Sequence, residues 1–294
     1  KLLSQLFGER MIIANATGCS SIYSGTFPTT PYTKNKEGRG PTWANSLFED
    51  NAEYGYGMRL AVDANRNQLQ WNVEQLLAKG TTPELADALN KSLALWQKKD
   101  DEAQKAADGV KKLLPEALKK ASEDTKPFIR KIMELESYFV DKSVWCIGGD
   151  GWAYDIGYGG LDHVLASTRN INVLVLDTEV YSNTGGQASK STPLASVAKF
   201  ASAGKRTNKK DLGLISMSYG HIYVASVCLG ANMNQVVKAM LEAEAYDGPS
   251  IIIAYSPCIA HGIDMGKTIE EEKKAVESGY WSLFRYNPDL KKEG

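Results

Sequence analysis

The order of hydrophobic and polar positions along the chain predicts an α/β fold. Four apolar runs punctuate its second half, at Val144–Ile147, Val173–Leu176, Leu212–Met217 and Ile251–Ala254. Helical patterning lies between or after these runs, near residues 155–168, 193–203, 232–245 and 268–283. Because the runs do not alternate between apolar and polar residues, both faces of each strand are expected to be buried. The pattern is typical of a mostly parallel sheet flanked by helices, and Met11–Asn15 is expected to add a strand to it.

A helical segment interrupts this pattern. Residues 27–56 are rich in Pro, Thr, Asn and Gly and are interpreted as an ordered covering loop, followed by a helix from about Met58 to Leu77. Thr82-Pro83 marks a helix start, because a hydroxyl can cap free amide groups and proline is tolerated at the first helical position. Two more helices are predicted near 102–121 and 126–139. We interpret residues from about 81 to 140 as a helical insertion without chemistry of its own.

Composition and charge narrow the classes of partner. Hydrophobic residues make up 43% of the 294 positions and charged residues 23%, as in ordinary globular proteins. A formal net charge of −1 provides no electrostatic reason to expect nucleic acid or an anionic membrane as a partner. No apolar run approaches the roughly 20 residues that a membrane-spanning helix needs. We therefore expect neither nucleic acid nor a membrane among the partners.

The four cysteines have different settings. So few in a chain of this length do not indicate a disulfide framework, and a reducing cytoplasm is the expected location. Cys146 and Cys228 lie in apolar runs, which predicts buried thiols. Cys19 and Cys258 lie in loops of small residues just after strands. A thiolate at either position can face a ligand, with an inert thiol as the alternative.

A glycine-flanked acidic residue ends one predicted strand. Asp150 stands between Gly149 and Gly151, whose lack of side chains lets the backbone approach an anion closely. A helix starting beyond Tyr154 would direct amide groups towards the same anion. Asp150 would repel a bare phosphate, so binding of a phosphate here requires a divalent cation between the two. Mg²⁺ takes oxygen ligands and suits this role.

The next predicted strand ends in further oxygen ligands. Thr178 lies 28 residues after Asp150, which is room for one helix and one strand, so it should emerge beside Asp150 at the same sheet edge. Thr178 offers a hydroxyl and Val180 a backbone carbonyl, while Asn183 lies within reach of a diphosphate or of the reacting group. The alternative is that both segments are ordinary turns. Their spacing favours a Mg²⁺–diphosphate site.

Five segments closely resemble the pyruvate:ferredoxin (flavodoxin) oxidoreductases. They read GGDGWAYDIG at 148–157, YSNTGGQ at 181–187, IANATGCSS at 13–21, WANSLFEDNAE at 43–53 and YSPCIAHG at 255–262. The resemblance spans nearly the whole chain apart from the helical insertion. It implies that residues 1–294 form the C-terminal thiamine diphosphate-binding α/β domain of a longer multidomain chain, as the opening within a helix and the lack of a closing element also suggest.

The resemblance also implies roles for individual residues. Mg²⁺ would be held by Asp150, Thr178 and the carbonyl of Val180, and Asn183 would in addition take part in catalysis. The residues implied to bind the cofactor are Cys19, Gly149, Asp150, Gly151, Trp152, Thr178, Glu179, Val180, Tyr181, Ser182 and Asn183. Cys19 and Cys258 match two of the four ligands of a 4Fe–4S cluster, and the other two cysteines are expected upstream of Lys1.

The implied activity is the oxidative decarboxylation of pyruvate to acetyl-CoA and CO₂, with electrons passing through 4Fe–4S clusters to ferredoxin or flavodoxin. The implied partners are the remaining domains of the same enzyme, pyruvate, coenzyme A and a second copy in a homodimer. Two alternatives stay open. A cluster-free thiamine diphosphate-dependent decarboxylase or transferase would leave Cys19 and Cys258 unused, and a non-catalytic α/β scaffold would use none of these residues.

Overall fold

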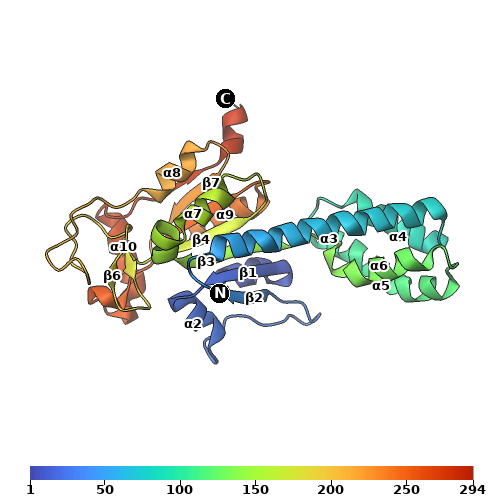
Figure 1. Cartoon of the computed structure of the whole chain (residues 1–294), viewed down its shortest axis with the longest axis horizontal. Coiled ribbons are helices and arrows are strands. Elements are labelled where there is room, and N and C mark those ends of the chain that lie inside the picture. Colours follow the sequence, from blue (N-terminus) through green and yellow to red (C-terminus); the bar gives the residue numbers. More distant parts are fainter. Residues whose placement is uncertain (294) are drawn as a thin grey trace. The chain divides into compact units, whose positions relative to one another are not determined.

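A seven-stranded sheet organises the larger of two compact units. The computed structural model describes residues 1–293, with side chains described for residues 1–290. The sheet has the order β2-β1-β3-β4-β8-β7-β9. Its strands are β1 (Met11–Ala16), β2 (Thr42–Ser46), β3 (Ser143–Gly149), β4 (Asn172–Asp177), β7 (Tyr223–Val227), β8 (Ser250–Tyr255) and β9 (Phe284–Tyr286). All neighbours pair in parallel except β7 and β9, which are antiparallel. The predicted α/β class with a mostly parallel sheet is confirmed (Figure 1).

Helices cover both faces of this sheet, as its buried strands require. The helices of the unit are α1 (Leu2–Phe7), α2 (Cys19–Gly25), the start of α3 (Asn51–Lys79), α7 (Tyr158–Leu165), α8 (Leu212–Ser218), α9 (Met233–Ala245) and α10 (Thr268–Glu277). Trp145 of β3 lies in one core cluster with residues of α1 and α9. Its neighbour Cys146 points to the opposite face, where it lies against Gly55 of α3. Side chains that alternate between two covered faces explain why the strands are apolar throughout.

Shorter elements complete the unit. They are the 3₁₀ turns η1 (Gly8–Arg10), η4 (Ile259–His261), η5 (Met265–Lys267) and η6 (Pro288–Glu293), the π-helical turn η3 (Gly151–Ile156), and the strand pair β5 (Val180–Tyr181) and β6 (Gln187–Ala188). The strands β5 and β6 pair antiparallel outside the main sheet.

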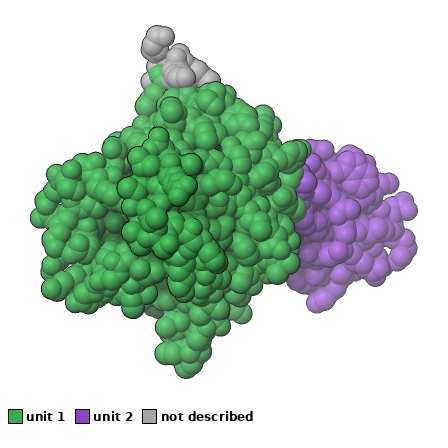
Figure 2. All heavy atoms as spheres, turned by 60° about the vertical axis from the view of Figure 1, so that its left-hand side comes forward, with its two compact units in different colours: residues 1–57, 143–294 green, residues 58–142 purple. Residues whose placement is uncertain are grey.

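A second compact unit comprises residues 58–142, while residues 1–57 and 143–294 make up the first (Figure 2). It contains most of α3, then α4 (Pro83–Ala94), α5 (Asp101–Lys120), α6 (Lys126–Leu135) and the turn η2 (Glu136–Tyr138). Its own core includes Leu89 and Leu114. Inside it, the Arg66 guanidinium donates to the carbonyls of Trp96 and Tyr138 at 2.6 and 2.8 Å. The predicted insertion, about 81–140, lies within this unit.

Two predicted elements are wrong. The run Leu212–Met217 is not a strand but lies in helix α8, where the Asp211 carboxylate accepts a hydrogen bond of 2.8 Å from the Leu214 amide at the helix start. Leu214 is exposed, so the run has one buried side and not two. The strand of this region is β7, which is buried at every position.

The predicted helix near 193–203 is a bridged loop. Ala195 and Phe200 adopt left-handed backbone angles, with φ of 67° and 65°, which a regular helix does not allow. The backbone hydrogen bonds of the segment are those of turns and of bridges to neighbouring loops, for example from the Ala201 amide to the Ala198 carbonyl at 2.9 Å and from the Lys199 amide to the Gly186 carbonyl at 3.0 Å. Leu194, Val197 and Phe200 are all exposed, so no core contacts are available to stabilise an amphipathic helix here.

The expected covering loop at 27–56 also contains an unpredicted strand, β2. It pairs in parallel with β1, for example Ile13 with Trp43, and forms one edge of the sheet. Its burial is uneven, which is typical of an edge strand and hides it from a search for continuous apolar runs.

Candidate active site

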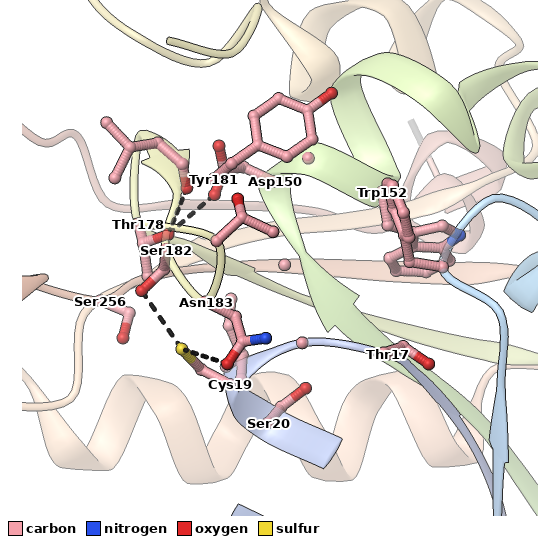
Figure 3. Close-up of a pocket in the computed structure, with 17 residues that line it drawn as sticks. Thr17, Cys19, Ser20, Asp150, Trp152, Thr178, Tyr181, Ser182, Asn183 and Ser256 are labelled. Atoms are coloured by element: carbon pink, nitrogen blue, oxygen red, sulfur yellow. Dashed lines mark hydrogen bonds between the residues drawn. The ribbon is translucent and has the colours of Figure 1, made fainter. Parts of the chain in front are cut away.

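The carboxyl ends of β1, β3 and β4 meet at a cavity of about 230 Å³. Its walls come from five segments that are far apart in sequence: the residues after β1, Phe48 after β2, the end of β3 with η3, the loop after β4, and the loop after β8 (Figure 3). The residues lining it are Thr17, Gly18, Cys19, Ser20, Phe48, Gly149, Asp150, Gly151, Trp152, Leu176, Thr178, Val180, Tyr181, Ser182, Asn183, Thr184 and Ser256. Adjacent parallel strands bring these loops to one edge.

A cluster of oxygen atoms forms one wall of the cavity. The Thr178 hydroxyl lies 2.8 Å from Oδ1 of Asp150 and 2.9 Å from the carbonyl oxygen of Val180. One hydroxyl has only one proton and can donate to only one of these two acceptors. The Ser189 hydroxyl donates to Oδ2 of Asp150 at 2.6 Å. The cluster is therefore rich in acceptors and short of donors.

Asp150 is buried without a cationic partner. It is 1% exposed, and no lysine or arginine side chain within residues 1–290 forms an ion pair with it. Burial, and next the charge of Asp177, raise the pKa of Asp150 to about 7, although the hydrogen bonds from Ser189 and Thr178 act in the opposite direction. A bound cation would favour the ionised form. Carboxylate, hydroxyl and carbonyl oxygens are ligands that suit Mg²⁺.

Gly148 and Gly151 are needed because neighbouring side chains pack closely against their backbone, and neither has a left-handed backbone angle. A Cβ on Gly148 would lie 2.5 Å from the Trp152 ring and 2.8 Å from Ala16. A Cβ on Gly151 would lie 2.5 Å from the Tyr181 ring. Helical structure starts directly after Gly149, earlier than the predicted start beyond Tyr154, and its first complete turn is the π-helical η3. Asp150 is therefore the residue directly before this turn, and the first backbone amide groups of the turn lie beside it.

Cys19, which was expected in a loop but is the first residue of helix α2, and Cys258, in the loop after β8, both contact one hydroxyl. The Oγ atom of Ser182 is 3.4 Å from Sγ of Cys19 and 3.0 Å from Sγ of Cys258. Cys19 is exposed at the cavity, whereas Cys258 is buried just behind its wall. Cys146 and Cys228 differ from both, because burial raises the pKa of their thiols to about 12 and about 11. Sequence spacing alone did not require Cys19 and Cys258 to meet, and the fold brings them together.

The structure separates Glu179 from the other predicted cofactor residues. Its backbone follows Thr178, but its side chain is not among those lining the cavity. The carboxylate instead lies 2.9 Å from Nζ of Lys209. Asn183 and Trp152 do line the cavity, and the Asn183 amide oxygen lies 3.9 Å from Sγ of Cys19.

Two side chains that contact Asp150 or Thr178 are not among the predicted site residues. Ser189, which bonds Asp150, belongs to a Ser-Lys-Ser-Thr run at 189–192, and this run of hydroxyls was the available signal. His261 lies 3.0 Å through Nε2 from the Thr178 carbonyl, which can only accept, so that nitrogen carries the proton. Within the described residues, no group of three or more His, Cys, Asp and Glu side chains is arranged to hold a metal by itself.

Comparisons with known proteins show what the chain is similar to. The family model "Thiamine pyrophosphate enzyme, C-terminal TPP binding domain" matches residues 133–254. The chain is 57% identical over 297 residues to the pyruvate:ferredoxin oxidoreductase of Moorella thermoacetica, an alignment that covers 100% of this chain and 25% of that protein. It is 57% identical over 298 residues to the pyruvate-flavodoxin oxidoreductase of a Nostoc species, covering 100% of this chain and 24% of that protein. The chain thus spans about a quarter of the length of these curated relatives.

A solved structure shares the fold. A 2-oxoglutarate:ferredoxin oxidoreductase from Magnetococcus marinus, solved with 2-oxoglutarate, coenzyme A and succinyl-CoA bound, superposes with a TM-score of 0.51 at 16% identity. The match covers 86% of this chain and 56% of that one. The chain is therefore homologous along its whole length to a quarter of the pyruvate:ferredoxin and pyruvate-flavodoxin oxidoreductases, and it contains a thiamine pyrophosphate (thiamine diphosphate)-binding domain.

Proposed function

We propose that this chain supplies the Mg²⁺–thiamine diphosphate site of a 2-oxoacid oxidoreductase that decarboxylates pyruvate, transfers the acetyl group to coenzyme A and passes electrons to ferredoxin or flavodoxin. The observation that supports this most is the buried Asp150 carboxylate, which lacks a cationic partner and shares the Thr178 hydroxyl with the Val180 carbonyl. Asp150, Thr178 and Val180 would hold the metal. The names of the relatives support pyruvate as the substrate.

The other cavity residues have defined tasks in this proposal. Bound thiamine diphosphate supplies the nucleophilic carbon and the electron sink that decarboxylation needs. The amide groups at the start of η3 would face a bound diphosphate, and the Gly151–Tyr181 contact would shape the wall beside it. Asn183 places an amide in the cavity, where it can hold the carbonyl oxygen of a reacting 2-oxoacid.

We also propose that Cys19 and Cys258 are two ligands of a 4Fe–4S cluster. Their sulfur atoms both contact the Ser182 hydroxyl, next to the cavity, which suits electron transfer over a short distance. Two further thiolates would come from outside these 294 residues. A cluster-free thiamine enzyme would leave this pair of thiols unused.

The remaining partners belong to the same proposal. They are the other domains of a chain about four times as long, and a second copy in a homodimer, in the cytoplasm. The described helices offer no segment with the length and apolar character for crossing a bilayer.

Calorimetry on the intact enzyme tests the metal site. Thiamine diphosphate binding should depend on Mg²⁺ in the parent, and Asp150→Asn should abolish that dependence. Asp87→Asn, an exposed aspartate of α4, is the matched control and should bind as the parent does. Unchanged Mg²⁺-dependent affinity in Asp150→Asn would refute the assignment.

A further inference from the structure

An ion-pair network that the proposed chemistry does not use lies directly behind the oxygen cluster. Nζ of Lys209 is 2.9 Å from Oδ2 of Asp177 and 2.9 Å from Oε1 of Glu179. Asp177 is fully buried and the side chain of Glu179 is 7% exposed. These two carboxylates flank Thr178, so Lys209 is bound to both neighbours of a proposed metal ligand.

The backbone at Glu179 is strained. Its φ of 62° lies in the left-handed region, which costs a residue with a side chain on the order of 1 kcal/mol or more. This angle reverses the chain between Thr178 and Val180, and so brings the hydroxyl of the first within 2.9 Å of the carbonyl of the second. A strained angle persists only where surrounding contacts hold it.

Several contacts hold Glu179 in that conformation. The Tyr280 hydroxyl donates to Oε2 of Glu179 at 2.5 Å, and the Thr192 hydroxyl donates to its carbonyl at 2.5 Å. The Glu179 amide donates to Oδ1 of Asp177 at 3.1 Å. Asp177 and Glu179 are both buried, and a buried carboxylate without a cationic partner would destabilise the fold. Lys209 is paired with both of them.

Lys209 also links the metal loop to the segment between β6 and α8. That segment carries Ser189, whose hydroxyl bonds Asp150 directly. Trp281 lies across the Lys209 ammonium, 4.9 Å from ring centre to Nζ, and shields it from solvent. The Lys209 side chain is still 26% exposed, but both carboxylates are buried, so salt screens this ion pair less than a surface pair.

We propose that Lys209 is a positioning residue: by pairing with Asp177 and Glu179 it holds the turn at Thr178–Val180 that directs two oxygens at Asp150, and thereby sets the affinity of the site for divalent cation. The inference rests on the proposed Mg²⁺–thiamine diphosphate function. Its alternative is a purely structural ion pair that stabilises the fold without affecting the metal.

Mg²⁺ titrations at saturating thiamine diphosphate separate the two. In the intact enzyme, Lys209→Met should raise the apparent Kd for Mg²⁺ at least tenfold, and Lys209→Arg should return it to within about threefold of the parent, because a guanidinium can bridge the same two carboxylates. Lys274→Met, which removes an exposed lysine paired with Glu271 on α10, is the control and should leave the Kd unchanged. The thermal unfolding midpoint is recorded for each variant without ligand.

A lowered unfolding midpoint with an unchanged Mg²⁺ Kd in Lys209→Met would overturn the inference while leaving the metal site intact. If Lys209→Met does not fold, Tyr280→Phe decides the question, because it removes one hydrogen bond from Glu179 without leaving a charge unpaired. It should raise the Kd severalfold, and no change would again overturn the inference. Absence of any Mg²⁺ response in the parent would instead refute the proposed function itself.

Discussion

The Thr178 hydroxyl lies 2.8 Å from Oδ1 of Asp150, although the two residues are 28 positions apart in the chain. β3 ends at Gly149 and β4 at Asp177, and the two strands pair in parallel with Gly149 opposite Leu176. The crossover between them therefore returns the chain to the same edge of the sheet.

Gly151→Ala should disrupt the cavity wall. The added methyl would lie 2.5 Å from the Tyr181 ring, which is itself packed edge-on against Phe48. We expect at least a tenfold loss of thiamine diphosphate affinity in the intact enzyme, and a loss of about 1–3 kcal/mol in stability from overpacking.

Gly159→Ala is the matched control for this change. Gly159 lies in α7, and a Cβ there would meet no atom within 4 Å. Alanine is favoured over glycine inside a helix, so stability should stay equal or rise by up to about 1 kcal/mol, with unchanged affinity. Equal behaviour of the two variants would contradict the close approach at Gly151.

Cys258→Ser in the intact enzyme should remove one cluster. We expect about four iron and four sulfide ions fewer per chain, with loss of the corresponding electron paramagnetic resonance signal. Cys228→Ala should retain the iron and sulfide content and the signal of the parent, because that thiol is buried in the core and donates to the Glu272 carbonyl at 3.3 Å. Full iron and sulfide content in Cys258→Ser would rule out its proposed role as a ligand.

The pH dependence of stability should report the state of Asp150. Its pKa in the folded, metal-free protein is raised from 3.8 to about 7, so ionisation costs stability. The cost is absent below the unfolded value, grows as the pH rises, and is complete above about 7. Asp150→Asn avoids it and should be more stable than the metal-free parent at pH 8, by about 2–4 kcal/mol, with the difference vanishing near pH 4.

Mg²⁺ should reverse this order. It binds the ionised carboxylate, so its stabilising effect on the parent should weaken as the pH falls below about 7, and Asp150→Asn should show none of it. Thermal unfolding across pH 4–8.5, with and without Mg²⁺ and thiamine diphosphate, measures both effects. A pH-independent difference between parent and variant would argue against a raised pKa at Asp150.

Leu89→Ala tests whether the helical unit is separate from the chemistry. Leu89 is fully buried in the core of residues 58–142, so its truncation should cost about 2–5 kcal/mol. All residues lining the cavity belong to the other unit, and thiamine diphosphate affinity should not change. Leu60→Ala, at a leucine that is 39% exposed, serves as the control and should cost little. Loss of affinity in Leu89→Ala would assign the helical unit a part in binding.

Local patterns predicted the buried strands well and the exposed segments poorly. β3, β4 and β8 are nearly continuous apolar runs because helices cover both of their faces. The run at Leu212–Met217 has the same composition, yet it forms a helix with Leu214 exposed. Short apolar runs do not distinguish a strand from a helix, and only the neighbours available for packing decide between them.

The candidate site shows the same division. The meeting of Asp150, Thr178 and Val180 could be predicted because strand ends and crossover lengths are local properties of the chain. Ser189 and Lys209 could not, since they lie in a long connection whose course no periodicity predicts. Glu179 was expected to face the cofactor, but its left-handed backbone turns it towards Lys209.

The amino-acid sequence by itself determined the fold class, the strand ends that bear the proposed metal ligands, and the family resemblance, because these depend on short motifs and on periodic burial. Only the tertiary structure decided that Cys19 and Cys258 both contact the Ser182 hydroxyl. It also decided that Lys209 pairs with the two residues on either side of Thr178 in the chain. These contacts join residues from separate loops and from the start of α2, and a loop follows the surface that the packed strands and helices present to it, not a pattern of its own.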